Sequence, residues 1–446
     1  MTDGLKTARR SLSAALLSAT LLAAALPAAG EPPRPPAADY DRAVLEIERH
    51  VAERYVEKAR APAVLAALAE GRRSGRYARA ESPHAFAILV TEDLRRASQD
   101  GHMYIDWAPD RHRSLTEALA AGQSPGDSDA LWLERARREN AGLTEQKLLE
   151  GNVRYLKVSA FLWVPQSSPA VYVRAMAFLQ GGDAVIIDLR GNGGGDPAAV
   201  NYLASHFLPP ETKLMTFVMA GGEEVSISQK SLPAGRISGK PVYVLIDKGV
   251  ASAGEEFAQH VEKFRFGELI GETTAGAGNR NEHLPVGPGW ALSVSVGLAK
   301  HATDGAGWEG VGIRPATAVA PARALDLAQA RALERLAQAA GEPRRAEYLW
   351  AAEVAKVRAE PVALAPAALA RYAGVYGERT VRVEGETLVY QRQGGPELRL
   401  TPMGGDRFIA GPRSELSIVF EFAGDRTSAA VVSYADGRRL RYARTG

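Results

Sequence analysis

The stretch that decides the fold is residues 184–195, which read Ala-Val-Ile-Ile-Asp-Leu-Arg-Gly-Asn-Gly-Gly-Gly. The largely apolar run from 184 to 189 predicts a strand that is buried on both faces. The glycines that follow let backbone N–H groups converge on an anion, because no Cβ atom obstructs them. Two functional uses compete, a phosphate cradle for a nucleotide and an oxyanion hole for acyl transfer, while a purely structural turn is the commonest case. The spacing fits neither a Walker loop nor the dinucleotide fingerprint.

A second segment of the same kind follows further along the chain. Residues 242–247 (Val-Tyr-Val-Leu-Ile-Asp) predict another buried strand, and residues 249–257 (Gly-Val-Ala-Ser-Ala-Gly-Glu-Glu-Phe) predict the start of a helix. One interpretation is structural, with Ser252 and Glu255 forming a capping box. The other is catalytic, because the N-terminus of a helix favours the negative charge that develops when a serine attacks a carbonyl group. The local pattern leaves both open.

Short strands and helices alternate around these two segments. Residues 153–158 alternate as a strand, whereas 170–179 and 197–207 have the apolar spacing of helices. Runs of valine and isoleucine between helices indicate an α/β core.

The amino terminus has the order of a secretory signal. Lys6, Arg9 and Arg10 precede an uncharged run at 11–25, and small residues follow at 28–30. A buried helix is the alternative, but the basic flank and the proline-rich stretch after residue 30 favour a signal peptide. We therefore expect a periplasmic or extracellular mature chain, with no membrane span after signal removal.

The composition excludes several classes of function. The chain has no cysteine, which rules out disulfides, thiolate nucleophiles and zinc–thiolate sites. The formal net charge is only +2 with acids and bases well mixed, so nothing indicates a nucleic-acid groove or a polybasic membrane patch.

Composition and periodicity also divide the chain into parts. We expect a signal peptide (1–30), an N-terminal helical domain (31–107), a connecting segment (108–150) that is charged and irregular at 108–140, an α/β core (151–320), a helical linker that acts as a strut (321–361) and a small all-β domain of barrel or sandwich type (362–446).

Taken together, the motifs resemble a known family. Four segments are similar to motifs of the tail-specific, or C-terminal processing, serine peptidases. They are residues 188–195, 252–257 (Ser-Ala-Gly-Glu-Glu-Phe), 269–276 (Leu-Ile-Gly-Glu-Thr-Thr-Ala-Gly) and 309–315 (Glu-Gly-Val-Gly-Ile-Arg-Pro). The resemblance is specific over 140–318 and looser over 40–107. The segment 108–140 between these parts is too short to hold a peptide-binding insert such as a PDZ domain. It implies a crotonase-like (ββα superhelix) peptidase core and a serine-type endopeptidase of peptides or proteins, with Ser252 as nucleophile.

The family has two catalytic versions, which differ in the general base. In one, a lysine in the glycine-rich turn after the serine is the base, and that position is Ala277 here. In the other, similar to tricorn core proteases and interphotoreceptor retinoid-binding proteins, a histidine from the N-terminal domain serves. Residues 98–102 (Ser-Gln-Asp-Gly-His) resemble that motif, so the resemblance implies His102 as the base. His283 is the rival.

The resemblance also implies the remaining parts of the site. Tricorn-type sites carry a glutamate late in the core, which Glu309 matches, and a serine immediately before the histidine, where this chain has Gly101. A water molecule can replace that missing hydroxyl. The expected oxyanion donors are the N–H of Ala253 and an N–H of the turn at Gly193 and Gly194. No metal or organic cofactor is needed.

Two functions of other classes compete with the peptidase. A catalytically silent protein could bind an apolar ligand or a peptide on the same core, as the retinoid-binding relatives do. A crotonase-type acyl-CoA enzyme would leave Ser252 without a role. The combination of a serine, a histidine and a glycine-rich turn favours the peptidase, and labelling by a fluorophosphonate distinguishes the three.

Overall fold

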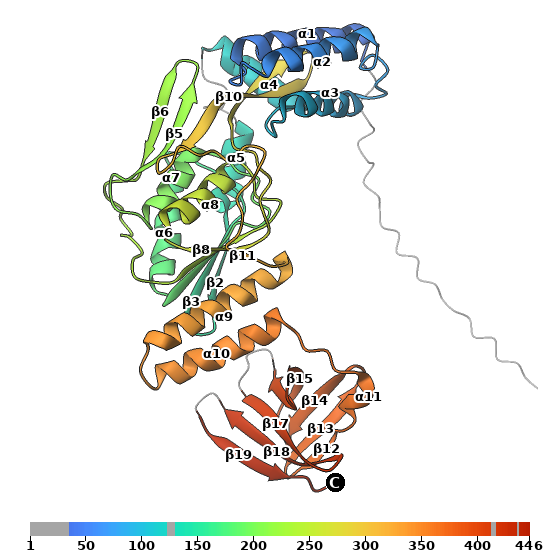
Figure 1. Ribbon diagram of the computed structural model, residues 1–446, viewed down its shortest axis with the longest axis vertical. Coiled ribbons are helices and arrows are strands. Elements are labelled where there is room, and N and C mark those ends of the chain that lie inside the picture. The colour runs from blue at the N-terminus through green and yellow to red at the C-terminus, as the bar shows by residue number, and fades with distance from the viewer. Residues whose placement is uncertain (1–34, 123–129, 412–415, 435–436) are drawn as a thin grey trace, which may run out of the picture.

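The computed structural model describes residues 35–122, 130–411, 416–434 and 437–446. The chain is elongated, with a layer of helices at one end, an α/β region in the middle and a β-barrel at the other end (Figure 1). The expected signal peptide, residues 1–30, lies outside the described residues. Within the described ranges, no helix is both long and apolar enough to cross a membrane.

The N-terminal helices share a hydrophobic core with strands from a distant part of the chain. Trp290 is fully buried in this core, and its ring centroid lies 5.7 Å from that of Tyr40 and 4.8 Å from that of Phe86. The segment expected to be an N-terminal helical domain is helical, but strands that were assigned to the α/β core complete its interior. The elements of this layer are α1 (Ala37–Arg54), α2 (Ala61–Arg73), α3 (Pro83–Ser98), β9 (Arg280–Val286) and β10 (Trp290–His301).

Strand β10 connects this layer to the α/β region. An antiparallel sheet runs in the order β1-β10-β5-β6, and β9 pairs with β10 as well. The first half of β10 pairs with β1 and its second half with β5. The other strands of this sheet are β1 (Tyr104–Trp107), β5 (Lys213–Met219) and β6 (Gly222–Ile227).

The central sheet is mainly parallel, as the valine and isoleucine runs predict. Its order is β11-β8-β7-β4-β3-β2, and only β2 (Leu143–Leu149) is antiparallel to its neighbour. Because β4 and β7 are adjacent and parallel, the glycine turn after β4 and the Ser252 loop after β7 lie at the same edge of the sheet. The strands are β3 (Val153–Val158), β4 (Ala184–Asp188), β7 (Val242–Ile246), β8 (Glu268–Gly271) and β11 (Thr317–Ala318).

Helices cover both faces of this sheet. Val185 and Ile187 of β4 pack in one core, whereas Ala184 and Ile186 pack in the other, as expected when successive side chains point to opposite faces. Helices of the α/β region cover the first face: α6 (Ser168–Gln180), α7 (Pro197–Ser205) and α8 (Ala253–Phe264).

The connecting segment 108–150 is more regular than expected, because its part at 108–140, predicted to be irregular from its charge, is mostly helical where the structure describes it. Part of it is helical, and its last part pairs with β3 as an edge strand of the central sheet. Leu115 and Ala118 are the buried residues of the first helix, so few apolar residues suffice there and the local pattern is weak. The elements are α4 (Pro109–Ala120), α5 (Ala130–Arg138), the 3₁₀ turn η1 (Asn140–Gly142) and β2 (Leu143–Leu149).

The helices of the expected linker are α9 (Pro321–Ala339) and α10 (Arg344–Ala359). Helix α9 does more than act as a strut, because its buried alanines pack on the second face of the central sheet. Helix α10 packs beside α9 and also contacts the C-terminal domain, where Val354 and Val357 meet Ile409.

The C-terminal domain is a small β-barrel. Its strands pair antiparallel in chain order, and the N–H of Thr445 donates to the carbonyl of Val375 while the N–H of Val375 donates to the carbonyl of Gly446, which joins the last segment to the first strand. Together with the bridge between Tyr376 and Arg444, these hydrogen bonds close the sheet on itself. The elements are α11 (Pro366–Leu369), β12 (Gly374–Tyr376), β13 (Arg379–Glu384), β14 (Thr387–Arg392), β15 (Glu397–Gly404), β16 (Arg407–Ala410), β17 (Leu416–Ala423), β18 (Arg426–Tyr434) and β19 (Arg439–Ala443).

Candidate active site

Ser252 is the N-cap residue of α8 and has an unusual backbone conformation. Its φ is 53° and its ψ is −123°, in a region that residues with a side chain rarely adopt. Two hydrogen bonds hold its N–H group, one to the carbonyl of Ala277 at 3.1 Å and one to Oε2 of Glu255 at 3.0 Å. Strain of this kind persists only where the surroundings impose it, and it is common at active sites. Ser252 is therefore held as a positioned residue and not simply as a helix cap.

Glu255 organises the loop beside the serine, a role that the sequence did not reveal. Its carboxylate is fully buried and accepts hydrogen bonds from the hydroxyl of Thr274 at 2.5 Å and from the N–H of Gly276 at 2.6 Å. It also accepts from the N–H of Ala277 at 2.8 Å and from Nε1 of Trp308 at 3.1 Å. Burial raises the pKa of this carboxyl group, and the hydrogen bonds oppose that shift. The network fixes the glycine-rich turn against the start of α8.

The glycine turn after β4 lies directly against the serine. Gly194 has a φ of 109°, and a Cβ atom added to it would lie 2.7 Å from Cβ of Ser252 and 3.2 Å from the nitrogen of Ala253. The N–H of Gly194 already donates to Oδ1 of Asn192 at 2.8 Å. Among the described residues, the N–H of Gly193 has no hydrogen-bond partner, and a Cβ atom on this glycine would meet nothing within 4 Å. Gly193 is thus the member of this pair whose N–H remains available.

His102 lies next to two carboxylates in the turn between α3 and β1. One potential ligand atom from each of Asp100, His102 and Glu309 lies within 4.8 Å of the other two. The backbone N–H of His102 donates to Oδ1 of Asp100 at 2.9 Å, and its carbonyl accepts from the hydroxyl of Ser293 at 2.6 Å. The structure brings together two of the expected site residues, His102 and Glu309, and adds Asp100, which the sequence did not single out.

Backbone N–H groups from two loops bind the carboxylate of Glu309. Gly101 donates to Oε1 at 2.9 Å, while Gly278 and Asn279 donate to Oε2 at 2.6 Å and 2.8 Å. The same loops meet at Ala277, because a Cβ atom on Gly101 would lie 3.3 Å from the Ala277 methyl group. The methyl group of Ala277 therefore packs against the turn that carries His102, the candidate base. Its carbonyl group accepts a hydrogen bond from Ser252, the candidate nucleophile.

The link between nucleophile and base is indirect. Within the described part of the chain, no hydrogen bond joins the hydroxyl of Ser252 to the ring of His102; Ala277 connects the two segments. Burial lowers the pKa of the His102 imidazole, an effect that the charge of Asp100 opposes. Burial and the Asp100 charge both raise the pKa of Glu309, against the hydrogen bonds from the loop N–H groups.

The two alternatives to His102 as general base, His283 and a lysine at position 277, are less suited to that role. Nε2 of His283 lies 3.1 Å from the hydroxyl of Tyr104, with which it shares a hydrogen bond. Burial, helped by the charges of Arg111 and His102, lowers the pKa of His283 to about 3. The position of the lysine in the other catalytic version is held by Ala277, which has no ionisable group.

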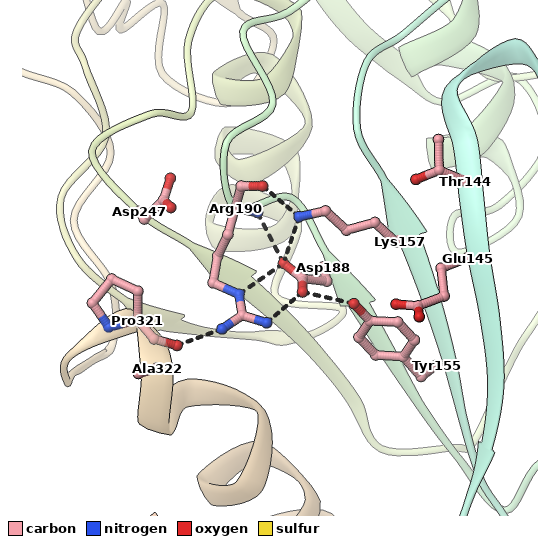
Figure 2. Close-up of a pocket in the computed structure, with 9 residues that line it drawn as sticks. All are labelled: Thr144, Glu145, Tyr155, Lys157, Asp188, Arg190, Asp247, Pro321 and Ala322. Carbon is pink, nitrogen blue, oxygen red and sulfur yellow. Dashed lines mark hydrogen bonds and ion pairs between the residues drawn. The ribbon is translucent and has the colours of Figure 1, made fainter. Parts of the chain in front are cut away.

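A polar cavity of about 590 Å³ lies at the same edge of the central sheet, beside the Asp-Leu-Arg motif (Figure 2). Asp188 accepts a hydrogen bond from the hydroxyl of Tyr155 at 2.8 Å and pairs with Arg190 at 2.5 Å and with Lys157 at 3.2 Å. Burial opposes its ionisation, but these cations outweigh burial and hold the pKa of Asp188 below its ordinary value. Arg190 also donates to the carbonyl of Pro321. Since no candidate catalytic residue lines the cavity, we interpret this cluster as an anchor between the motif and α9.

Comparison with known proteins bears on the α/β region. Residues 152–319 match the profile of "Peptidase family S41". The carboxy-terminal processing protease CtpB of Bacillus subtilis is 25% identical over 208 residues, which are 44% of this chain and 41% of the relative. The carboxyl-terminal-processing protease of Synechocystis is 32% identical over 124 residues, which are 28% of each chain. The matches thus span less than half of these two relatives.

Solved structures are similar over a larger part of the chain. A lipoprotein from Streptococcus agalactiae is 17% identical with a TM-score of 0.45, and the alignment covers 66% of this chain and 96% of the lipoprotein. The photosystem II D1 C-terminal processing protease is 17% identical with a TM-score of 0.40, over 63% of this chain and 93% of the protease. The family profile and the matches to curated sequences thus make residues 152–319 of this chain similar to peptidase family S41, which the matched relatives represent as C-terminal processing proteases.

Proposed function

We propose that this protein is a serine-type endopeptidase that cleaves peptide bonds through an acyl-enzyme on Ser252, with His102 as general base. The observation that carries the proposal is the placement of a strained serine at the start of α8, against the glycine turn at 193–194. The loop that holds this serine through Ala277 also holds Glu309 beside His102. The match of residues 152–319 to peptidase family S41 supports the same reaction class.

The reaction begins when a ring nitrogen of His102 accepts the proton of the Ser252 hydroxyl. The serine oxygen forms a bond to the carbonyl carbon of the substrate, and the C=O electron pair moves onto the carbonyl oxygen. His102 then gives its proton to the amide nitrogen, the C–N bond breaks and the amine leaves. Water attacks the acyl-enzyme by the same route and restores the serine. No step needs a metal or an organic cofactor.

The oxyanion would be held by backbone N–H groups at the edge of the sheet. The N–H of Ala253 is in the first turn of α8, where helical N–H groups lack intrahelical partners. The N–H of Gly193 is the donor of the glycine turn, because that of Gly194 is taken by Asn192. One such donor typically lowers the barrier by about 3 kcal/mol.

Glu309 would orient His102 and stabilise the imidazolium ion. The ring lies within 4.8 Å of the carboxylates without a direct hydrogen bond to either in the described residues, a separation that one water molecule can bridge. Gly101 stands where the family resemblance expects a serine, so we place that water where the hydroxyl would be. The helical layer and the α/β region each contribute one of the two reacting groups. Contacts of this kind are often long in the free enzyme and shorten when substrate binds.

We further propose that the α/β region has the crotonase-like topology of the family and that peptides or proteins are the substrates. The matched relatives are named as processing proteases, which supports this substrate class. Residues 1–30 would direct the chain to the periplasm or the exterior and be removed there. Amino-terminal sequencing of the exported protein tests this, since a retained Met1 would contradict it.

The test of the function is hydrolysis of an unfolded protein, such as fluorescently labelled casein. Ser252→Ala and His102→Ala should each lower turnover by on the order of 10⁶-fold. The double variant should have a turnover only slightly lower than either single variant, because the effects of substituting groups that act as a unit are not additive. Glu309→Gln should cost less, since it only assists the base. Unchanged turnover in Ser252→Ala would refute the assignment. A catalytically silent binding protein would leave casein intact.

A further inference from the structure

The cluster of Asp100, His102 and Glu309 has the composition of a divalent-metal site. A single donor atom from each residue lies within 4.8 Å of the other two. Imidazole nitrogen and carboxylate oxygen are ligands that Zn²⁺ prefers in proteins, and a zinc ion needs three or four of them. In a tetrahedral zinc site the ligand atoms lie about 2.0–2.2 Å from the ion and therefore about 3.3–3.6 Å from one another, so atoms that are 4.8 Å apart have to approach by about 1.5 Å.

The imidazole ring of His102 has a nitrogen that is free to bind a metal ion. Its side chain is almost fully buried, with 7% of the residue exposed, and Nδ1 has no hydrogen-bond partner among the residues that the structure describes. A buried ring nitrogen normally has a partner, because burying a polar atom without one costs free energy. The negative charge of Asp100 acts on both His102 and Glu309, and the positive charge of Arg95 also acts on His102. A cation between the three side chains would satisfy the nitrogen and relieve the repulsion between the two carboxylates.

The carboxylates are already oriented by other hydrogen bonds. Asp100 accepts from the backbone of His102 at 2.9 Å and from Nδ2 of Asn279 at 3.0 Å. Glu309 accepts from N–H groups of the loops on both sides. Each carboxylate oxygen has two lone pairs, so an oxygen that accepts one hydrogen bond can still bind a metal ion. Hydrogen bonds of this kind fix metal ligands in position and raise the affinity of the site.

We propose that Asp100, His102 and Glu309 bind a zinc ion and that the ion inhibits the peptidase. The inhibition, though not the binding, rests on the proposed function. A neutral imidazole has one N–H and one lone pair. Whichever nitrogen binds zinc, the other one carries the proton, so neither can accept the proton of Ser252. The ion thus acts as a reversible inhibitor and not as a cofactor.

Binding is tested apart from catalysis by calorimetric titration of ZnCl₂ into untagged, metal-free Ser252→Ala protein. We expect one site, weakened at least 10-fold by Asp100→Asn and also by Glu309→Gln, which keeps the shape of the side chain. Asp106→Asn, a matched change in the neighbouring strand β1, should leave the affinity unchanged. Absence of binding would overturn the proposal, as would equal affinity in folded Asp100→Asn and Glu309→Gln proteins.

Inhibition is tested with the wild-type enzyme and casein. Zinc at the concentration that saturates the calorimetric site should abolish hydrolysis, and EDTA should restore it. Full activity with the site saturated would overturn the inhibitory role. If calorimetry shows the site but the wild-type protein hydrolyses no substrate with or without EDTA, the proposed function fails while the metal site stands.

Discussion

Replacement of Gly194 by alanine tests whether the glycine turn and the nucleophile form one site. The added methyl carbon would lie 2.7 Å from Cβ of Ser252 and 3.0 Å from the carbonyl oxygen of Ala251. Carbon atoms in contact are normally about 3.5–4.0 Å apart, so the serine has to move by roughly 1 Å. The neighbouring backbone cannot move freely, because Glu255 and Ala277 hold the N–H of Ser252.

The size of the effect follows from this displacement. A misplacement of about 1 Å at a reacting group can cost 10²-fold in rate, so kcat should fall about 100-fold in Gly194→Ala. The control is Gly191→Ala in the same turn, where φ is also positive at 74° but an added Cβ would meet nothing within 4 Å. The Gly191→Ala variant loses about 1–2 kcal/mol of stability, because alanine is strained in a left-handed conformation, but its methyl group does not collide with Ser252. Its kcat should stay within about threefold of wild type by the same argument.

The assay is steady-state hydrolysis of casein or a derived peptide, with circular dichroism and thermal melting to establish that both variants are folded. A folded Gly194→Ala enzyme with the kcat of Gly191→Ala would refute the reasoning, because the turn would then not lie against the reacting serine.

Three further changes test other parts of the account. Gly101→Ser supplies a hydroxyl near Glu309 in place of the proposed water and should be at least as active as wild type, whereas Gly101→Ala, with the same Cβ 3.3 Å from the Ala277 methyl group, should be less active in the casein assay. Burial raises the pKa of Glu256 to about 8 from 4.5, so the folded state keeps a proton that the unfolded state loses, and stability falls as pH rises between these values. Between pH 6.5 and 8 this loss is at most about 2 kcal/mol. It should be absent from Glu256→Gln in denaturant unfolding, whereas His260, which is neutral in the folded state with a pKa of about 3, titrates in the unfolded state of both proteins alike. A chain that ends near Pro361 lacks the barrel but keeps the sheet and its helices, so it should fold and react with a fluorophosphonate; aggregation or loss of labelling would make the barrel integral to the site.

The sequence predicted the central sheet because its signals are local. The Val-Ile run that becomes β4 and the Val-Tyr-Val-Leu-Ile run that becomes β7 are apolar on both faces, as strands buried between helices require. The motif resemblance also suggested Glu309 as a partner of His102, and in the structure one donor atom of each lies within 4.8 Å of the other. Ser252 stands at the start of α8, where the pattern expected it.

The missed features depend on contacts between distant parts of the chain. The apolar face of β10 alternates visibly, but nothing local says that it covers helices α1 to α3, more than a hundred residues earlier in the sequence. Asp100 was overlooked because a carboxylate in a polar turn is ordinarily solvated, whereas here the loops around Asn279 enclose it. Glu255 looked like half of a capping box, and only the position of the glycine-rich turn shows that its carboxylate also holds Gly276 and Ala277.

The central claim is that His102 activates Ser252, and the rate of fluorophosphonate labelling tests it most directly because no natural substrate is required. Wild-type protein should be labelled on Ser252, as identified by mass spectrometry of the modified peptide. His102→Ala should slow labelling by about 10²–10⁴-fold, the usual contribution of a general base. His283→Ala should label at nearly the wild-type rate. Labelling on another residue, or a rate lost in His283→Ala and kept in His102→Ala, would contradict the account.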